Sequence, residues 1–557
     1  GQTGIAQRNY ENSSGKDAVK ITNDGSIALT GNNAVGIASD YGHVINNSTV
    51  KTTGEKSVAI YSANGTTTKN NGEIVIGGNN SAGIYGANYL DGINSSAVLK
   101  YGDDKIDISN NGRIISEGNG KVYGIYADNK YLSRNDSAVR LGSGSNIDLS
   151  SSNGGVGIYA NNTRLTGEGI LSVGNSGVGL YAKDSDVNLN NFTLNLNGDK
   201  ALGFYLDGNT NFTGNGNINI NGNGILVFNI NSNGTFTNDF IINSSAGSTY
   251  TLGNVADNTF RYTGSASLAG NGSFIYGKNS AVLLDTGSVI NAAEDNVVGI
   301  SMEGQYNGSL PSGFQSGVDA ENKGDITLTG SNSAGIYAVN SSRVKNSGNI
   351  TVGNNSAGIS TKGTASTAVK SGTISIGEIS TGIYGSESSF AENTADGKIL
   401  SNASETAGIY MDGSATAQLV NNGLVELNGD KSRGIYVKGN GVKTITNNGT
   451  VKIGNSSDIN NPGIGIYSTG SGNTILNSGN ILTGNNSVGI YADGGTVNQS
   501  GLIMTGSSGT GIYGDRANIV LNAGSEINVG NDKAAGIYAL NGTSIISNGK
   551  LTAGENS

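Results

Sequence analysis

The stretch "NNGEIVIGGNNSAGIYGAN" at residues 70–88 returns, with small changes, along most of the chain. Close copies of its second half are "GSNSAGIYAVN" at 330–340 and "GNNSVGIYADG" at 484–494. When the copies are aligned on the tyrosine, most of them are separated by about 24 residues. A repeat of this length cannot bury a core by itself, so successive copies must stack on one another.

Each repeat holds three short segments with the alternation of a half-buried strand. One follows an Asn-Gly or Ser-Gly turn, as in "NSGNITVG" at 346–353, the second is the "AGIYA" segment, and the third precedes the next such turn, as in "SSRVKNSG" at 341–348. Alternation bounded by Gly/Asn turns is typical of β-strands. We therefore predict an all-β fold, a right-handed parallel β-helix (β-solenoid) with three short strands per turn and about 23 turns in 557 residues.

The alternation also predicts the direction of the side chains. The third residue of "AGIYA", such as Ile84 or Leu180, is large and apolar and should lie in the core. The next residue, usually Tyr, should point outward and stack from turn to turn. The Asn two residues before the strand-initiating Gly should form a second row of hydrogen-bonded amides, which Lys370 and Gln499 interrupt. The members of this row are Asn70, Asn110, Asn322, Asn346, Asn421, Asn447, Asn477 and Asn522.

Composition narrows the possible functions. The chain contains 91 glycines, two prolines and no cysteine, so Gly/Asn turns are plentiful and thiolate chemistry is excluded. Its net charge is −10 and no cluster of Lys or Arg stands out, so nucleic acid is not an expected partner. Neither a signal peptide nor an apolar run long enough for a membrane-spanning helix is present, and we expect a mature region or a fragment.

The domain plan follows from the places where the repeat is interrupted. We treat residues 1–557 as a single β-helix segment with altered, degenerate coils at 206–300 and a loop excursion at 302–324. Two further excursions, at 88–105 and 130–145, resemble each other in sequence. Binding residues in repeat proteins lie preferentially on such loops. The paired excursions are therefore the first candidates for a ligand site, and the alternative is that they are inert insertions.

The similarity of the paired excursions aligns Tyr89 with Tyr131, Leu90 with Leu132, Ile106 with Ile147 and Asp107 with Asp148. On successive turns they should build one raised surface. Aromatic, carboxylate and guanidinium groups on one surface suit a sugar or a protein ligand. The candidate ligand-binding residues are Tyr89, Asp91, Tyr101, Asp103, Asp104, Tyr131, Arg134, Asp136 and Arg140.

The sequence gives little support to catalysis. His43 is the only histidine, so a Ser-His-Asp triad would have to centre on a repeat residue, and "GTGIYG" at 509–514 matches a dinucleotide motif in letters but precedes no helix. We expect no enzyme, no catalytic residues, no cofactor and no metal. Some parallel β-helices do cleave polysaccharides with acidic and basic residues on one face, and Asp103, Asp104 and Arg134 keep that alternative open.

The repeats resemble a known family. "NNGTVKIGNSS" (447–457), "NSGNITVGNNSAGIS" (346–360) and "TGNNSVGIYADGG" (483–495) are similar to the passenger region of large type V autotransporter adhesins, particularly those of fusobacteria. The resemblance covers essentially the whole chain, most clearly 1–205 and 321–557. It implies a right-handed parallel β-helix displayed on the bacterial surface, with an outer-membrane barrel at the C-terminus of the parent protein that we expect to lie outside this chain.

The same resemblance implies adhesion. The expected partners are host-cell glycans of the galactose or N-acetylgalactosamine type, a lymphocyte receptor, or other bacteria in coaggregates. No binding residue of the family matches a position in this chain. A structural stalk, with binding elsewhere in the parent protein, is the alternative within the same class.

Overall fold

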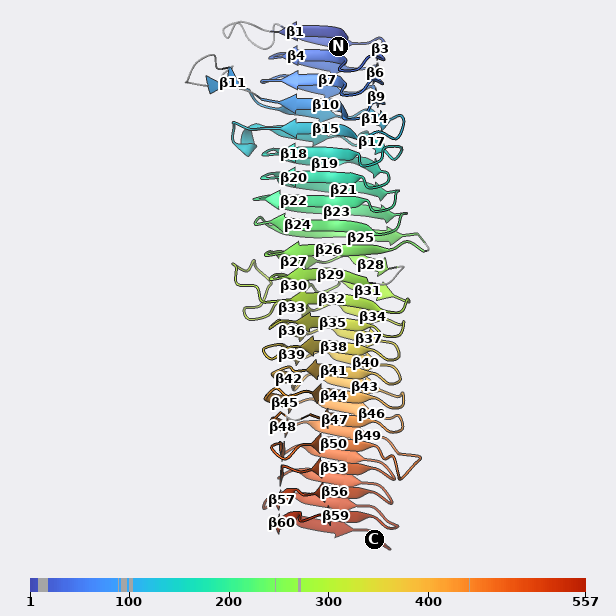
Figure 1. Cartoon of the computed structure of the whole chain (residues 1–557), viewed down its shortest axis with the longest axis vertical. Coiled ribbons are helices and arrows are strands. Elements are labelled where there is room, and N and C mark those ends of the chain that lie inside the picture. Colours follow the sequence, from blue (N-terminus) through green and yellow to red (C-terminus); the bar gives the residue numbers. More distant parts are fainter. Residues whose placement is uncertain are drawn as a thin grey trace. The chain divides into compact units, whose positions relative to one another are not determined.

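The computed structural model describes residues 1–8, 19–88, 90–91, 98–99, 104–245, 247–268, 272–439 and 441–557. The chain divides into two compact units, Gly1–Gly270 and Asn271–Ser557. Each unit is a parallel β-helix, in which equivalent strands of successive turns lie side by side (Figure 1). The predicted fold class is confirmed. The units together hold about 21 turns, slightly fewer than predicted because loops lengthen several turns.

Three rows of strands build the turns of unit 1. Row A contains the "GIY" segments, row B the strands before the Asn-Gly turn and row C the strands after it. Row A consists of β1 (Thr3–Arg8), β4 (Val35–Asp40), β7 (Val58–Ala63), β10 (Ser81–Ala87), β15 (Val122–Asp128), β18 (Val156–Asn161), β20 (Val178–Lys183), β22 (Leu202–Gly208), β24 (Ile225–Ser232) and β26 (Tyr250–Ala256). Row B consists of β2 (Lys20–Asn23), β5 (His43–Asn46), β8 (Thr67–Asn70), β13 (Asp107–Asn110), β16 (Ala138–Leu141) and β27 (Thr259–Tyr262). Row C consists of β3 (Ile27–Leu29), β6 (Thr49–Thr52), β9 (Glu73–Ile76), β14 (Arg113–Ser116), β17 (Asn146–Leu149) and β28 (Ser265–Leu268).

In the middle of unit 1, rows B and C merge into long continuous strands. Three of the four merged strands pass through one or two residues with positive φ in place of the Asn-Gly turn, namely Gly167 and Gly169 in the first, Asn191 in the second and Gly216 in the third. The alternation therefore persists where the repeat motif fades. The merged strands are β19 (Arg164–Val173), β21 (Asp186–Leu196), β23 (Asn211–Ile220) and β25 (Phe236–Ser244).

Unit 2 keeps the three rows separate. Row A consists of β29 (Gly272–Lys278), β32 (Val297–Glu303), β35 (Ala334–Val339), β38 (Ala357–Lys362), β41 (Thr381–Ser386), β44 (Ala407–Asp412), β47 (Arg433–Val437), β50 (Ile464–Thr469), β53 (Val488–Asp493), β56 (Thr510–Asp515) and β59 (Ala535–Leu540). Row B consists of β30 (Ala281–Leu284), β33 (Ala320–Asn322), β36 (Arg343–Asn346), β39 (Thr367–Lys370), β42 (Phe390–Asn393), β45 (Ala417–Asn421), β48 (Lys443–Asn447), β51 (Thr474–Asn477), β54 (Thr496–Gln499), β57 (Asn518–Leu521) and β60 (Ser544–Ser547). Row C consists of β31 (Val289–Ala292), β34 (Asp325–Leu328), β37 (Asn349–Val352), β40 (Thr373–Ile376), β43 (Lys398–Ser401), β46 (Leu424–Leu427), β49 (Thr450–Ile453), β52 (Asn480–Thr483), β55 (Leu502–Thr505), β58 (Glu526–Val529) and β61 (Lys550–Ala553).

The predicted side-chain directions in row A are confirmed. The isoleucine of each "GIY", such as Ile84 or Ile490, is fully buried, except for Ile537 in the last turn. The following tyrosines are half-exposed and stack along the outside, with ring centroids 4.8 Å apart for Tyr85 and Tyr126 and again for Tyr467 and Tyr491. Burial raises the pKa values of several of these tyrosines, such as Tyr85 and Tyr491, and raises that of Tyr181 to about 12. Among the described residues no helix is of a length and apolarity to cross a membrane.

The amide row is also present, in two stretches, at the last residue of the row B strands from β2 to β13 and from β33 to β54. Asn421 Nδ2 donates to Asn447 Oδ1, and Asn447 Nδ2 donates to Asn477 Oδ1, each over 2.7 Å, and all three residues are buried. Asn522 does not belong to the row, because Leu521 occupies this register position opposite Gln499. Asn522 was predicted because it lies two residues before Gly524, but β57 ends one residue earlier, at Leu521.

The prediction that Lys370 and Gln499 interrupt the amide row is wrong. Asn477 Nδ2 donates to Gln499 Oε1 over 2.8 Å, and Lys370 Nζ donates to Asn393 Oδ1 over 3.1 Å. Both side chains are longer than that of asparagine. Each also donates to the backbone carbonyl two residues further along the chain, as asparagines of the row such as Asn346 do. The row therefore continues through them with a different chemical group.

The alignment of the paired excursions needs correction. In the structure β13 pairs with β16, so that Asp107 lies opposite Ala138, and Ile147 of β17 lies opposite Ile114 of β14. The letters "IDIS" and "IDLS" are alike but belong to row B and row C, respectively. The second excursion is consequently a short loop at residues 129–137, because residues 138–141 form β16. Of the first, the structure describes β11 (Leu90–Asp91), antiparallel to β12 (Val98–Leu99), and residues from 104 onward.

Candidate ligand-binding groove

A tightly held loop follows β15 in unit 1. Asn129 at its base is fully buried; its Nδ2 donates to the carbonyls of Asn162 (2.8 Å) and Leu132 (3.1 Å), and its Oδ1 accepts from the Leu132 amide (3.1 Å). Asn162 Nδ2 donates back to the Leu132 carbonyl over 2.6 Å. The loop ends in the single helical turn η2 (Arg134–Asp136), at which the side chain of the N-cap residue Ser133 accepts from the backbone amide of Asn135. These bonds fix the position from which Arg134 extends.

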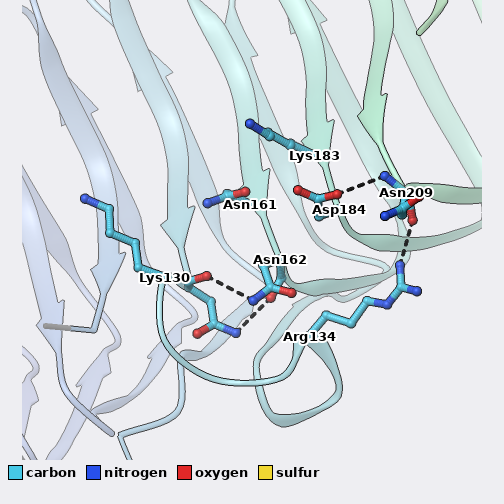
Figure 2. Close-up of a pocket in the computed structure, with 8 residues that line it drawn as sticks. Lys130, Arg134, Asn161, Asn162, Lys183, Asp184 and Asn209 are labelled. Atoms are coloured by element: carbon cyan, nitrogen blue, oxygen red, sulfur yellow. Dashed lines mark hydrogen bonds between the residues drawn. The ribbon is translucent and has the colours of Figure 1, made fainter. Parts of the chain in front are cut away.

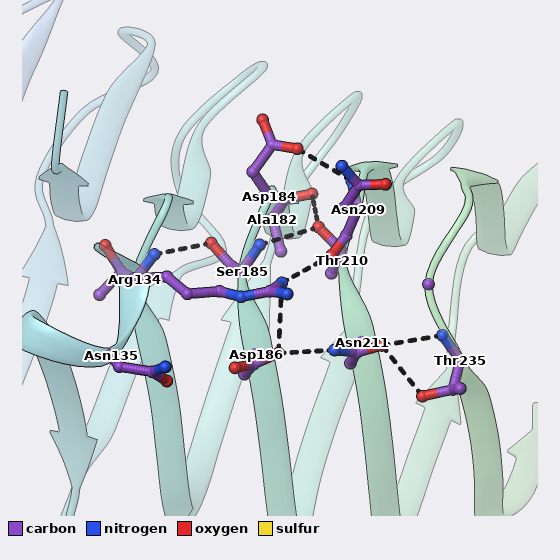
Figure 3. Close-up of polar contacts among 12 residues, drawn as sticks. Arg134, Asn135, Ala182, Asp184, Ser185, Asp186, Asn209, Thr210, Asn211 and Thr235 are labelled. Carbon is purple, nitrogen blue, oxygen red and sulfur yellow. Dashed lines mark hydrogen bonds and ion pairs between the residues drawn. The ribbon is translucent and has the colours of Figure 1, made fainter. Parts of the chain in front are cut away.

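Arg134 reaches across the turns that follow its own. Its guanidinium Nη1 donates to the Asn209 carbonyl over 2.7 Å and lies 3.3 Å from a carboxylate oxygen of Asp186 (Figure 3). Asp186 also accepts from Asn211 Nδ2, which belongs to the next turn. Because the ion pair is partly exposed, it contributes less than about 1 kcal/mol, and its main effect is to orient the guanidinium.

A polar groove of about 520 Å³ lies beside this loop (Figure 2). Its walls are the turns that directly follow β15, β18, β20 and β22. Asn162 and Asp184 have positive φ there, which turns the chain sharply and leaves their side chains partly exposed at one edge. The lining residues are Asn129, Lys130, Arg134, Asn161, Asn162, Lys183, Asp184 and Asn209.

The groove presents charges of both signs among amides. Asp128, 3.4 Å from Lys130 Nζ, raises the pKa of Lys130, and Asp184 Oδ1 accepts from the backbone amide of Asn209. Lys183 is exposed and has no carboxylate partner among the residues that the structure describes. Within the same described part of the chain, no cluster of His, Asp or Glu has a metal-binding arrangement. The groups lining the groove can therefore orient the hydroxyl, amide or carboxylate groups of a polar ligand.

The structure brings only part of the predicted site together. Arg134 lines the groove, and Tyr131 (45% exposed) and Asp136 lie on the same loop. Arg140 is exposed on β16 and forms an ion pair with Asp107, away from the residues that line the groove. Tyr89, Tyr101 and Asp103 lie outside the described residues, as does the side chain of Asp91.

Among the candidates whose side chains the structure describes, Asp104 is the one whose predicted exposure is wrong. It is fully buried where the chain re-enters the β-helix before β13. The sequence placed it in the excursion because it adjoins Asp103, whereas the structure returns to the repeat at this residue. A buried carboxylate cannot approach a ligand on the outer surface.

Sequence reasoning missed most of the lining residues, although the repeat contained the signal. Lys130, Asn162, Asp184 and Asn209 stand three or four residues after successive "GIY"-type tyrosines, so the alignment of the repeats puts them in one row. The interruptions of the repeat pointed to Arg134, whereas its ordinary turns supply most of the lining residues. The side chains in this row differ from turn to turn, so this edge presents a different chemical group at each turn.

The fold and the groove define this chain as a parallel β-helix that offers a polar concavity at the edge of its turns. Residues 6–202 match the family model of the BigA third pectate lyase-like domain, a β-helix domain of bacterial surface proteins. The match includes every lining residue except Asn209. A comparison with curated proteins finds no match.

Proposed function

We propose that this chain is part of the passenger of an autotransporter adhesin of the fusobacterial type, and that the groove beside Arg134 binds a glycan on a host cell or on another bacterium. The observation that carries the proposal is the groove itself. Four successive turns supply amides and charged groups at one edge, and a loop fixed by buried Asn129 holds a guanidinium over them. Polar, shallow sites of this kind suit hydroxyl-rich ligands.

The similarity of residues 6–202 to a β-helix domain of bacterial surface proteins supports exposure at the cell surface. Anchoring in the outer membrane, and a lymphocyte receptor as a second partner, rest only on the resemblance of the repeats to autotransporter adhesins. A β-helix acting as an inert stalk accounts for the repeats equally well. It does not account for a loop whose arginine is oriented over a groove.

Catalysis has weaker support than binding. Polysaccharide cleavage by a β-helix needs acidic residues that reach the substrate together. Of the acidic pair that suggested this chemistry, Asp104 is buried. Among the residues that the structure describes, Asp184 is the one acidic residue that lines the groove. We therefore propose a binding protein without enzymatic activity, and release of reducing ends from polysaccharides by the purified chain would contradict this.

Binding of the labelled chain to a glycan array and to panels of host and bacterial cells tests the proposal. Arg134→Ala removes the guanidinium from the groove, and Lys183→Ala removes the unpaired ammonium. Arg140→Ala is the matched control, because it removes an exposed arginine that also forms an ion pair but does not line the groove. We expect the first two variants to lose most of the binding and the control to keep it. Equal binding by all variants, or no binding by the wild type, would favour the stalk.

A further inference from the structure

The tyrosine stack of row A is interrupted in unit 2. Ser360 occupies the tyrosine position of β38, and its register partners on the adjacent strands are Tyr337 and Tyr384. Elsewhere in this unit, neighbouring tyrosine rings are 4.5 to 5.4 Å apart. Because strands of successive turns are about 4.8 Å apart, the omission of one ring leaves about 10 Å between the two flanking tyrosines. One aromatic ring therefore fits between the two flanking tyrosines, at stacking distance from both.

The structure contains a cavity at this place. It has a volume of about 510 Å³ and is bounded by Tyr337, Ser360 and Tyr384. Tyr384 has lost its neighbour on one side, and its ring is tilted by 44° from Tyr410, whereas Tyr467 and Tyr491 are within 4° of parallel. None of the residues that line the cavity is charged.

An exposed apolar residue with a strained backbone conformation lies at the rim of the cavity. Ile379 has φ 55° and is 54% exposed. A β-branched residue adopts this left-handed conformation unfavourably, and the two preceding turns have Asn332 and Asn355 at the same position, where asparagine is well tolerated. An exposed isoleucine on a strained backbone is explained if it contacts an apolar ligand in the adjoining cavity.

We infer that the gap at Ser360 is a docking slot for an exposed aromatic side chain of a protein partner, which completes the interrupted stack. The stack itself is the template, because its rings show that an aromatic ring is held favourably at each level between two others. The uncharged lining suits a neutral ring, Ile379 extends the apolar wall, and the exposed amides of Asn332 and Asn355 can bond the peptide backbone that carries the ring. Aromatic side chains inserted into pockets are typical anchors of protein interfaces.

This slot lies in unit 2 and is independent of the proposed glycan groove in unit 1, so either can fail without the other. Direct binding to the full chain can be measured by ligand-observed saturation-transfer NMR. The aromatic probe is N-acetyl-L-tyrosinamide, the apolar control is N-acetyl-L-leucinamide, and the sugar arm is methyl β-galactoside with methyl β-glucoside. Because the chain contains no tryptophan, the emission of N-acetyl-L-tryptophanamide provides a second readout.

Ser360→Tyr is the decisive variant, because it fills the slot with the residue that the row ordinarily carries. Its matched control is Ser301→Tyr, which adds a ring at the other interruption of the row in this unit. Ser301 belongs to β32 and lies opposite Tyr276 and Tyr337. We expect the wild type and Ser301→Tyr to bind the aromatic probes, and Ser360→Tyr to weaken binding at least tenfold while keeping the β-sheet circular dichroism spectrum.

Ile379→Asn provides a second test should Ser360→Tyr fail to fold, since it restores the residue of the neighbouring turns and removes the apolar wall. It should weaken binding of the aromatic probes severalfold. Undiminished binding by Ser360→Tyr or Ile379→Asn would overturn the inference. So would absence of aromatic binding by the wild type, or saturation of the methyl glycosides in place of the aromatic probes.

Discussion

Replacing Lys370 by glutamine should stabilise the turns around β39, and more strongly at acidic than at alkaline pH. The side chain of Lys370 is fully buried in the amide row, where its Nζ donates to the Gly372 carbonyl and to Asn393 Oδ1. Burial lowers its pKa from 10.5 to about 7, with a smaller contribution from the charge of Lys398. Glutamine fits this position, because Gln499 already accepts from the preceding asparagine and donates to the carbonyl two residues on. Its amide nitrogen carries a second hydrogen, which can be donated to Asn393 Oδ1.

The size and sign of the effect follow from proton linkage. Between pH 7 and 10.5 the lysine is protonated in the unfolded chain and largely neutral in the folded one. The unfolded state therefore binds more protons in this window, and stability rises with pH across it. Below pH 7 the lowered pKa of Lys370 reduces the free energy of unfolding by its full amount, at most about 5 kcal/mol. At pH 9 the reduction is still about 2 kcal/mol. Lys370→Gln should thus gain about 3 kcal/mol more at pH 6 than at pH 9.

Hydrogen exchange resolves the effect locally, which matters because turns of a repeat protein open separately. The exchange of peptides covering β36, β39 and β42 is compared between wild type and variant at the same pH, so that the intrinsic exchange rates cancel. Lys362→Gln, which removes an exposed lysine at the end of β38, is the control and should change nothing. If the protection gained by Lys370→Gln were the same at pH 6 and pH 9, the lysine would keep its proton on folding and the reasoning would be refuted.

Three further outcomes are expected. Asn447→Ala removes a buried amide that both accepts and donates within the row and should cost about 2–4 kcal/mol of local stability by hydrogen exchange, whereas Asn448→Ala, one residue on and exposed, should cost less than about 0.5 kcal/mol. Gly489→Ala places a Cβ 2.5 Å from a backbone oxygen of the next turn and should expose the neighbouring turns to limited proteolysis, whereas Gly25→Ala meets nothing within 4 Å and should leave the cleavage pattern unchanged. Arg343→Met leaves the fully buried carboxylate of Asp319 without its guanidinium, and this should cost about 3–5 kcal/mol and speed cleavage of the loop at 304–319.

The repeat was sufficient to predict the fold, because side-chain alternation and turn residues are local properties that recur in every turn. The alternation identified Ile84 as core and Tyr85 as stacked outside, and both are confirmed. Register was harder to predict where the motif fades, since "IDLS" fits either row B or row C in letters alone. The burial of Asp104 was also not predictable, because it depends on where an irregular loop rejoins the β-helix.

The groove required information from several turns at once. Arg134 was selected from its place in an excursion, but its contacts with Asp186 and Asn209 join residues far apart in sequence. Such a contact depends on the angle at which the loop leaves the surface, and the buried bonds of Asn129 set that angle. The lining residues of the later turns belong to ordinary repeats, so no local irregularity marked them.

The amide row has a direction, and Lys370 sets it for the turns that follow. From Lys370 through Asn393 to Gln499 every side chain donates to the next one along the chain. Below about pH 7 Lys370 is an ammonium group, which has no lone pair with which to accept. Reversing any one amide would set two donors or two acceptors against each other, so the amides can reverse only together. With a protonated lysine at the head of the row the reversed arrangement lacks its first acceptor. A row made only of asparagines could adopt either of two hydrogen-bond directions. One lysine in a single repeat leaves only one of them favourable.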